Sequence, residues 1–191
     1  MITRRIPAGA IMVDLPDIRQ PDDYSCGAGI LMSIACFYGV GPMEIEDFKK
    51  ALGTNPIYGT YHRDIARYAN ELGLNAEVTW DMSKRRLQSL LRHRVPVILS
   101  IQAWAEDEVV YLDPDHNKDG HYVGAIGYDR TDNFYFMDPS ITARRGFLSW
   151  PELDRRWHED EGFEEAEVHQ HLGIIIKPGR RRGAQRAWRI G

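Results

Sequence analysis

Residues Gln20 to Gly39 read QPDDYSCGAGILMSIACFYG, and this stretch predicts a buried helix that starts beside a cysteine. The run from Ala28 to Tyr38 carries no charged side chain, and Gly39, followed by Gly41-Pro42, is typical of a helix end. A helix that is apolar on every side lies in the centre of a domain. We therefore expect the core of the fold to form around this helix.

Cys26, at the start of the predicted helix, is a candidate nucleophile. The unpaired N–H groups and the positive end of the helix dipole stabilise an anion there, which favours the thiolate. The alternative is that the thiol packs as a small hydrophobic group, and Cys36, in the middle of the apolar run, fits that interpretation. Ten residues along a helix separate the two cysteines by roughly 15 Å, which is too far for a disulfide and indicates a reducing compartment.

The composition is that of an ordinary globular chain. With 191 residues, 43% of them hydrophobic and 27% charged, the chain is long enough for one domain with a good core. The net charge of -4 and the pI near 6.0 argue against general nucleic-acid or membrane binding. The first residues show no signal-peptide pattern, and no segment approaches about 18 uninterrupted apolar residues. We expect a cytoplasmic protein without membrane insertion.

A single domain is expected over residues 1–178, followed by a basic C-terminal tail over residues 179–191. Around this boundary, Lys177 to Gly191 hold six cationic side chains and no acidic one. A solvated tail is one interpretation, and a contact with an acidic partner is the other.

The hydrophobic pattern predicts further helices and strands along the chain. Residues 103–120 are acidic and indicate a surface excursion. Because helices come early, strands come late and the two do not alternate regularly, we expect an α+β fold with an antiparallel sheet. The helices are expected over 42–52, 61–72, 83–94 and 150–157, and the strands over 10–15, 74–80, 95–101, 121–128, 133–137 and 172–177.

His121 and Asp138 are the candidate partners of Cys26. A cysteine nucleophile needs a base, a group that orients the base, and donors for the oxyanion. His121 opens the strand over 121–128, and Asp138 follows the strand over 133–137. If these strands form a hairpin, the start of one lies beside the end of the other, so the two residues become neighbours. The carboxylate would then orient the imidazole, whose ordinary pKa near neutrality suits a general base and acid.

Gln20 is the candidate oxyanion donor. It lies six residues before Cys26 on a segment that prolines keep extended, so its amide could point at the carbonyl under attack, together with the Cys26 backbone N–H. Taken singly, Gln20 would be an ordinary loop residue, His121 a strand histidine and Asp138 a turn former. Their joint occurrence favours a catalytic site.

Four blocks of the sequence match one known family. They are Q-x5-C at Gln20 and Cys26, the run CGAGILMSIACFYG, G-H-Y-V at 120–123 and M-D-P-S at 137–140. On these blocks the sequence resembles papain-like cysteine peptidases, most closely the bacteriocin-processing peptidase domains that cleave after double-glycine leaders and their stand-alone relatives. The resemblance covers roughly residues 14–177. The chain departs from the family at Ser25, where the relatives usually carry Asp, and in the excursion over 103–120, which looks like an addition.

The resemblance implies a papain-like fold, with a helical lobe, an antiparallel sheet lobe and the cleft between them. It also implies that Cys26 is the nucleophile, His121 the base, Asp138 the orienting residue and Gln20 the oxyanion-hole donor. The expected function is a cysteine peptidase or related thiol hydrolase that acts on a peptide or protein through an acyl-enzyme, with no cofactor or metal. Two alternatives stay open: acyl transfer to an amine, and a binding module that has lost turnover. The oligomeric state is also open.

Two further motifs carry weaker signals. Residues 113–120 (DPDHNKDG) resemble the opening of a calcium loop, but Ile126 stands where that loop requires a bidentate acid, which favours a polar turn. His169 and His171 are expected on one face of a strand, but without a third ligand they are weak support for a zinc site.

Overall fold

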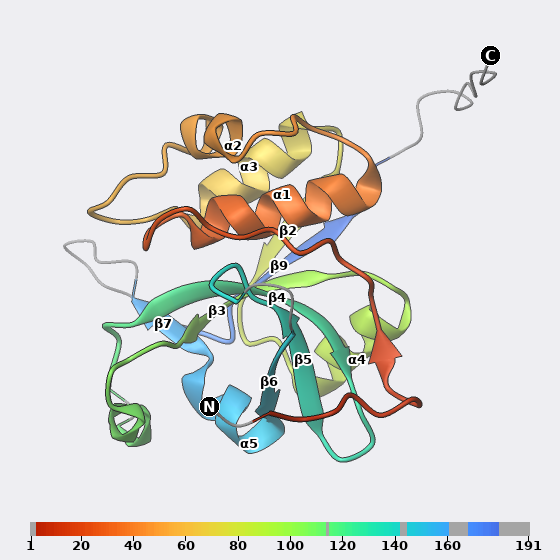
Figure 1. Ribbon diagram of the computed structural model, residues 1–191, viewed down its shortest axis with the longest axis vertical. Helices are drawn as coiled ribbons and strands as arrows, with labels where there is room; N and C mark the ends of the chain where they lie inside the picture. Colours follow the sequence, from red (N-terminus) through yellow and green to blue (C-terminus); the bar gives the residue numbers. More distant parts are fainter. Residues whose placement is uncertain (1–2, 114, 142–144, 161–167, 180–191) are drawn as a thin grey trace.

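A computed structural model describes residues 3–113, 115–141, 145–160 and 168–179 of the chain. Three helices, α1 (Cys26–Tyr38), α2 (Ile45–Leu52) and α3 (His62–Glu71), pack on one another and form a helical group above a large sheet (Figure 1). Two more helices, α4 (Lys84–Arg92) and α5 (Trp150–Arg156), lie around the lower part of the sheet. The expected basic tail falls almost wholly on residues 180–191, outside the described residues.

The sheet is antiparallel throughout, with the order β2-β9-β3-β4-β5-β6, and β1 pairs separately with β4. A second small sheet pairs β7 with β8. These findings confirm the α+β fold with an antiparallel sheet. The strands are β1 (Ile11–Met12), β2 (Asn75–Thr79), β3 (Val97–Gln102), β4 (Gly120–Tyr128), β5 (Asn133–Met137), β6 (Gly146–Ser149), β7 (His158–Asp160), β8 (Val168–Gln170) and β9 (Gly173–Lys177).

Helix α1 is the centre of the core, as its apolar sequence predicts. Its residues from Cys26 to Ala35 are all buried, and it packs against β4 as well as α2 and α3. The helix ends at Gly39, whose φ of 70° permits the left-handed turn and lets its N–H donate to the Cys36 carbonyl at 3.1 Å. On β4, Gly124 lets the helix come close, because a Cβ there would collide with the end of the Ile30 side chain.

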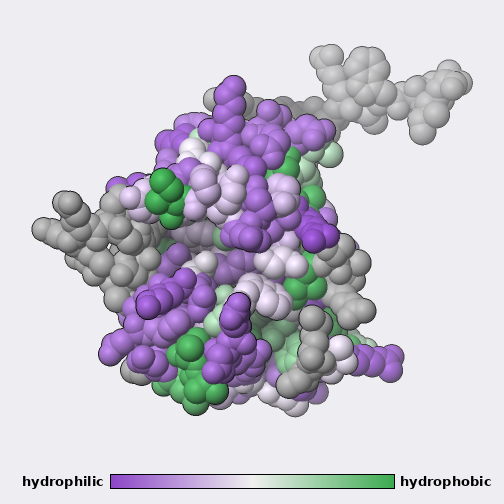
Figure 2. Space-filling view, turned by 60° about the vertical axis from the view of Figure 1, so that its left-hand side comes forward, coloured by the Kyte–Doolittle hydropathy of each residue, from purple (hydrophilic) through white to green (hydrophobic). Residues whose placement is uncertain are grey.

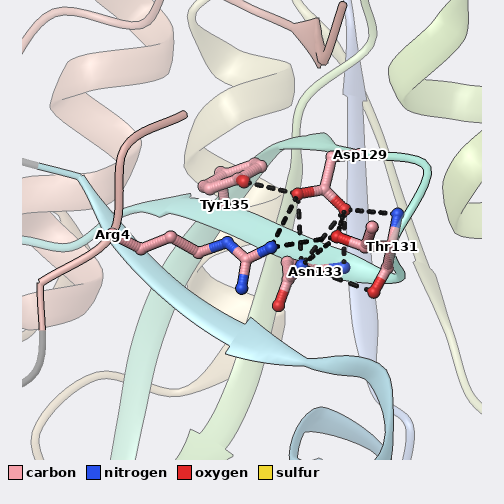
Figure 3. A network of polar contacts seen from close by, with 5 residues as sticks. All are labelled: Arg4, Asp129, Thr131, Asn133 and Tyr135. Atoms are coloured by element: carbon pink, nitrogen blue, oxygen red, sulfur yellow. Dashed lines mark hydrogen bonds and ion pairs between the residues drawn. The ribbon is translucent and has the colours of Figure 1, made fainter. Parts of the chain in front are cut away.

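The β4–β5 hairpin is fixed at its turn by a buried carboxylate (Figure 3). Asp129 accepts hydrogen bonds from the Thr131 backbone N–H at 2.8 Å, the Asn133 backbone N–H at 3.1 Å and the Tyr135 hydroxyl at 2.7 Å. The Arg4 guanidinium lies 3.8 Å from the same carboxylate. Burial alone would raise the pKa of Asp129, but these donors outweigh it and hold the pKa well below its usual range.

Several expected elements differ from those observed. Strand β1 is shorter than the predicted 10–15, strands β6 and β7 were not predicted, and β8 covers part of the strand expected around His169 and His171. His171 follows β8 in a turn with a φ of 48°, so the expectation that His169 and His171 share one face of a strand is wrong. The acidic excursion contains a short 3-10 helix, η1 (Glu108–Leu112), whose Tyr111 is buried under the Arg156 guanidinium at 4.1 Å. No helix among the described ranges has the length and apolar character needed to cross a membrane.

Candidate active site

Cys26 occupies the first position of α1, where the helical group meets the sheet, and only 8% of its surface is exposed. Ser25 precedes it as the N-cap residue without a capping bond from its side chain. The backbone N–H groups of Gly27 and Tyr122 instead point to the thiol of Cys26. The start of the helix therefore presents one donor to the sulfur, as the sequence predicts, and strand β4 presents another.

His121 and Asp138 meet at the open ends of the β4–β5 hairpin. The distance from His121 Nε2 to Asp138 Oδ1 is 2.8 Å, and both residues are buried. The imidazole also hydrogen-bonds the Cys26 thiol, so Nε2 faces the carboxylate and Nδ1 is left to face the sulfur. The structure thus brings together the three residues that the sequence predicted as neighbours.

The electrostatics of this group favour a thiolate beside an imidazolium. Burial raises the pKa of the Cys26 thiol. The hydrogen bond and the charge of His121 lower this pKa by more than burial raises it, so the net shift is downward. Burial likewise lowers the pKa of His121, but the contacts with Asp138 and Cys26 raise it to about 10. The histidine therefore departs from the near-neutral pKa expected from the sequence, because two acidic groups face its ring.

Gln20 lies beside the segment that follows β5. Its backbone N–H donates to the Pro139 carbonyl at 3.0 Å, and its side-chain Nε2 donates to the Asp22 carbonyl at 2.7 Å. Its Oε1 accepts a hydrogen bond from the Ser140 hydroxyl at 3.2 Å. One N–H of the amide is therefore bonded within the protein, and an amide nitrogen carries two.

Three residues around the site were missed by sequence reasoning. Asp22 accepts from Gln20 through its backbone, while its carboxylate binds Lys49 of α2 at 2.7 Å. Ser140 donates its backbone N–H to Asp138 Oδ1 at 2.8 Å and its hydroxyl to Gln20. The M-D-P-S block pointed to Ser140 without giving it a role, whereas no signal in the sequence links Lys49 to the site.

A cleft of about 320 Å³ opens beside Cys26. Its walls come from the residues just before α1, from the loop over 56–61, and from the end of the excursion with the start of β4. The excursion therefore shapes the cleft.

Hydrophilic side chains dominate the side of the molecule turned forward in Figure 2, with only scattered hydrophobic ones. Six of the lining residues are tyrosines or acids, namely Asp23, Tyr24, Tyr58, Tyr61, Tyr122 and Glu159.

The family model described as Peptidase_C39 like family matches residues 14–160. The chain belongs to this C39-like peptidase family. The match includes Gln20, Cys26, His121 and Asp138, and it confirms the resemblance found in the sequence. No protein in the comparison with curated proteins matches the chain.

Solved structures of several peptidases share the fold. A putative C39-like peptidase from Bacillus anthracis superposes with a TM-score of 0.66 at 15% identity, over 90% of this chain and 99% of that one. The peptidase domain of Streptococcus ComA, a bi-functional ABC transporter involved in quorum sensing, gives 0.61 at 19% identity, over 84% and 96%. A double glycine motif protease from an AMS/PCAT transporter, in complex with the leader peptide, gives 0.60 at 18%, over 87% and 94%. Family and fold together support cysteine peptidase activity in general terms.

Proposed function

We propose that this C39-like chain is a cysteine peptidase, or a related thiol hydrolase, that works through an acyl-enzyme on Cys26. The observation that carries the proposal is the buried contact of His121 with both Cys26 and Asp138, beside a cleft that Cys26 lines. A group shared in this way between a thiol and a carboxylate is suited to activate the thiol and then to return its proton.

The acylation step follows from the charges of the site. At neutral pH the proton lies on His121, because its pKa is raised to about 10 while that of Cys26 is lowered. The thiolate attacks the peptide carbonyl, and a C–S bond forms as the carbonyl oxygen becomes negative. The second N–H of the Gln20 amide and the Cys26 backbone N–H would stabilise that oxygen. The C–N bond then breaks as His121 passes its proton to the departing amine.

The hydrolysis step reverses these roles. The neutral imidazole takes a proton from a water molecule, which attacks the thioester carbonyl. The C–S bond breaks, the acid product leaves, and the proton on His121 again stands beside the thiolate. Asp138 holds Nε2 throughout and stabilises the imidazolium in both halves of the reaction.

The proposed substrate is a peptide or a protein segment that enters the cleft in extended form. The double glycine motif protease that shares the fold was solved in complex with its leader peptide, which supports a peptide as the ligand here. We assign the activity to a domain over residues 1–178, with the basic residues 179–191 as a tail beyond it.

Selective labelling tests the proposal directly. Iodoacetamide at neutral pH should alkylate Cys26 at least about tenfold faster than Cys36, because His121 lowers the pKa of Cys26 and so favours its thiolate. The Cys26→Ala variant should lose all turnover of peptide or ester substrates while it keeps its melting temperature, and Cys36→Ala should retain turnover. Equal labelling of the two cysteines, or turnover by Cys26→Ala, would refute the assignment.

A further inference from the structure

The segment after β5, residues 138–140, contacts both His121 and Gln20 of the candidate site. Asp138 Oδ1 accepts from His121 Nε2 and from the Ser140 backbone N–H, each at 2.8 Å. The Pro139 carbonyl accepts from the Gln20 backbone N–H at 3.0 Å, and the Ser140 hydroxyl donates to Gln20 Oε1 at 3.2 Å. A single short segment therefore holds the base's partner and the expected oxyanion donor at the same time.

This segment also rests directly on the helix that carries the nucleophile. A Cβ built on Gly29, in the first turn of α1, would lie 3.1 Å from Pro139 Cβ, so the proline ring and the helix are in contact. Asp138 and Pro139 are buried, whereas Ser140 is exposed. The buried neighbours therefore fix the backbone position of Ser140, and only its exposed hydroxyl can change without disturbing them.

The amide of Gln20 is held at both ends. Its nitrogen end donates to the Asp22 carbonyl at 2.7 Å, and its oxygen end accepts from Ser140. These two contacts set the plane of the amide and thereby the direction of the second N–H. Without the Ser140 hydroxyl, the Gln20 amide could rotate about its remaining hydrogen bond to the Asp22 carbonyl. The second N–H would then point in a range of directions.

We propose that Ser140 is a positioning residue that aims the Gln20 amide at the developing oxyanion, through the hydrogen bond from its hydroxyl to Gln20 Oε1. The inference rests on the proposed function, because it assumes that Gln20 stabilises the oxyanion. Ser140 acts through Gln20 and does not itself touch the substrate. Its backbone N–H, which supports Asp138, is a separate contribution that side-chain substitution leaves in place.

Two chemical probes separate aiming of the amide from activation of the thiol. Cys26 attacks p-nitrophenyl acetate at the carbonyl, so a C–S bond forms, an oxyanion develops, and p-nitrophenolate leaves as the C–O bond breaks. Alkylation by iodoacetamide displaces iodide at a saturated carbon and creates no oxyanion. A residue that aims Gln20 therefore affects the first reaction and spares the second.

The Ser140→Ala variant should slow acylation of Cys26 by p-nitrophenyl acetate about two- to tenfold, the range that corresponds to one neutral hydrogen bond. Because Ser140 is exposed, the lower part of that range is expected. Iodoacetamide alkylation of Cys26, followed by peptide mass mapping, should keep its rate. Ser140→Thr should restore acylation, and Ser89→Ala in α4, away from the site, should match the wild type.

A double-mutant cycle with Gln20 completes the test. Gln20→Ala should slow acylation by about 10²- to 10³-fold, the cost of one oxyanion donor, and Ser140→Ala should then add no further loss. The inference is overturned if Ser140→Ala has no effect, if its loss persists in the Gln20→Ala background, or if alkylation slows in parallel. Failure of the proposed function looks different, since the wild type would then acylate no faster than Cys26→Ala.

Discussion

His121 Nε2 and Asp138 Oδ1 lie 2.8 Å apart, although 17 positions separate the two residues in the sequence. The β4–β5 hairpin accounts for this, because Gly124 pairs with Met137, the last residue of β5, so Asp138 follows beside the first residues of β4, which include His121. The contact is buried, so little water competes with it. It holds one nitrogen of the imidazole and leaves the other for Cys26.

The Asp138→Asn variant should keep the fold and lose most of the activity. The amide has the same shape as the carboxylate but no charge, so the pKa of His121 falls and the imidazolium is no longer stabilised. We expect acylation by p-nitrophenyl acetate to slow about 10²-fold, within the range for positioned proton transfer. Asp154→Asn, on the surface of α5, is the control and should leave the rate unchanged. Wild-type acylation in Asp138→Asn would contradict the role of the carboxylate.

Alkylation of Cys26 should show the pH dependence of an ion pair. The rate should rise through a midpoint below the ordinary thiol value of 9.0, because His121 lowers the pKa of Cys26. In His121→Ala the midpoint should move upward toward that value. Iodoacetamide rates measured from pH 4 to pH 10, resolved for Cys26 by mass mapping, check the shift. An unchanged midpoint in the variant would show that the imidazole does not set the charge of the thiol.

The raised pKa of His121 also makes the stability of the fold depend on pH. Because the folded-state pKa of about 10 lies above the ordinary histidine value of 6.5, the protonated imidazole stabilises the fold fully below about pH 6.5. That contribution is lost as the pH rises through about 10. The free energy of unfolding, measured in urea at several pH values, should fall more steeply toward pH 10 in the wild type than in His121→Ala. Parallel curves would count against the interaction.

Lys49→Met tests the support beneath Gln20. The Lys49 ammonium binds the Asp22 carboxylate at 2.7 Å, and the Asp22 carbonyl in turn accepts from the Gln20 amide. Both charged side chains are partly exposed, so the loss of unfolding free energy should stay within about 1 kcal/mol. Acylation should slow a few-fold, whereas Lys50→Met, one position along on the exposed side of α2, should have no effect. Equal acylation rates for Lys49→Met and Lys50→Met would show that Lys49 does not support the site.

Asp129→Ala should be strongly destabilising. Its carboxylate, 5% exposed, receives several donors at the β4–β5 turn, and removing it leaves buried donors without an acceptor. We expect a loss of about 3 kcal/mol, the upper end for such a group, in urea unfolding at neutral pH. Because the pKa is lowered, the contribution is present above the ordinary carboxyl value of 3.8 and is lost as the pH falls. Arg130→Ala in the same turn should cost little, and a similar loss in both variants would argue against the carboxylate.

The helix α1 and the β4–β5 hairpin could be predicted because their signals are local. An uncharged run that stops at Gly39 indicates a central helix, and two apolar runs around a polar turn indicate a hairpin. The contact of Ser140 with Gln20 joins residues 120 positions apart, and it depends on how the segment after β5 packs on α1. No periodicity in the sequence encodes such an approach. The same holds for the pKa of His121, which is set by neighbours that only the fold assembles.

The pairing of the N-terminal segment has a mechanical consequence. Arg4 contacts the hairpin turn, Met12 pairs with Gly127 further along, and Gln20 bonds the Pro139 carbonyl at the opposite end. The N-terminal segment thus contacts the hairpin at successive points from its turn toward the site. A force applied at the N-terminus would break these contacts one after another and would reach Gln20 last. Under tension, then, Gln20, the proposed oxyanion donor, would be the final part of the segment to detach.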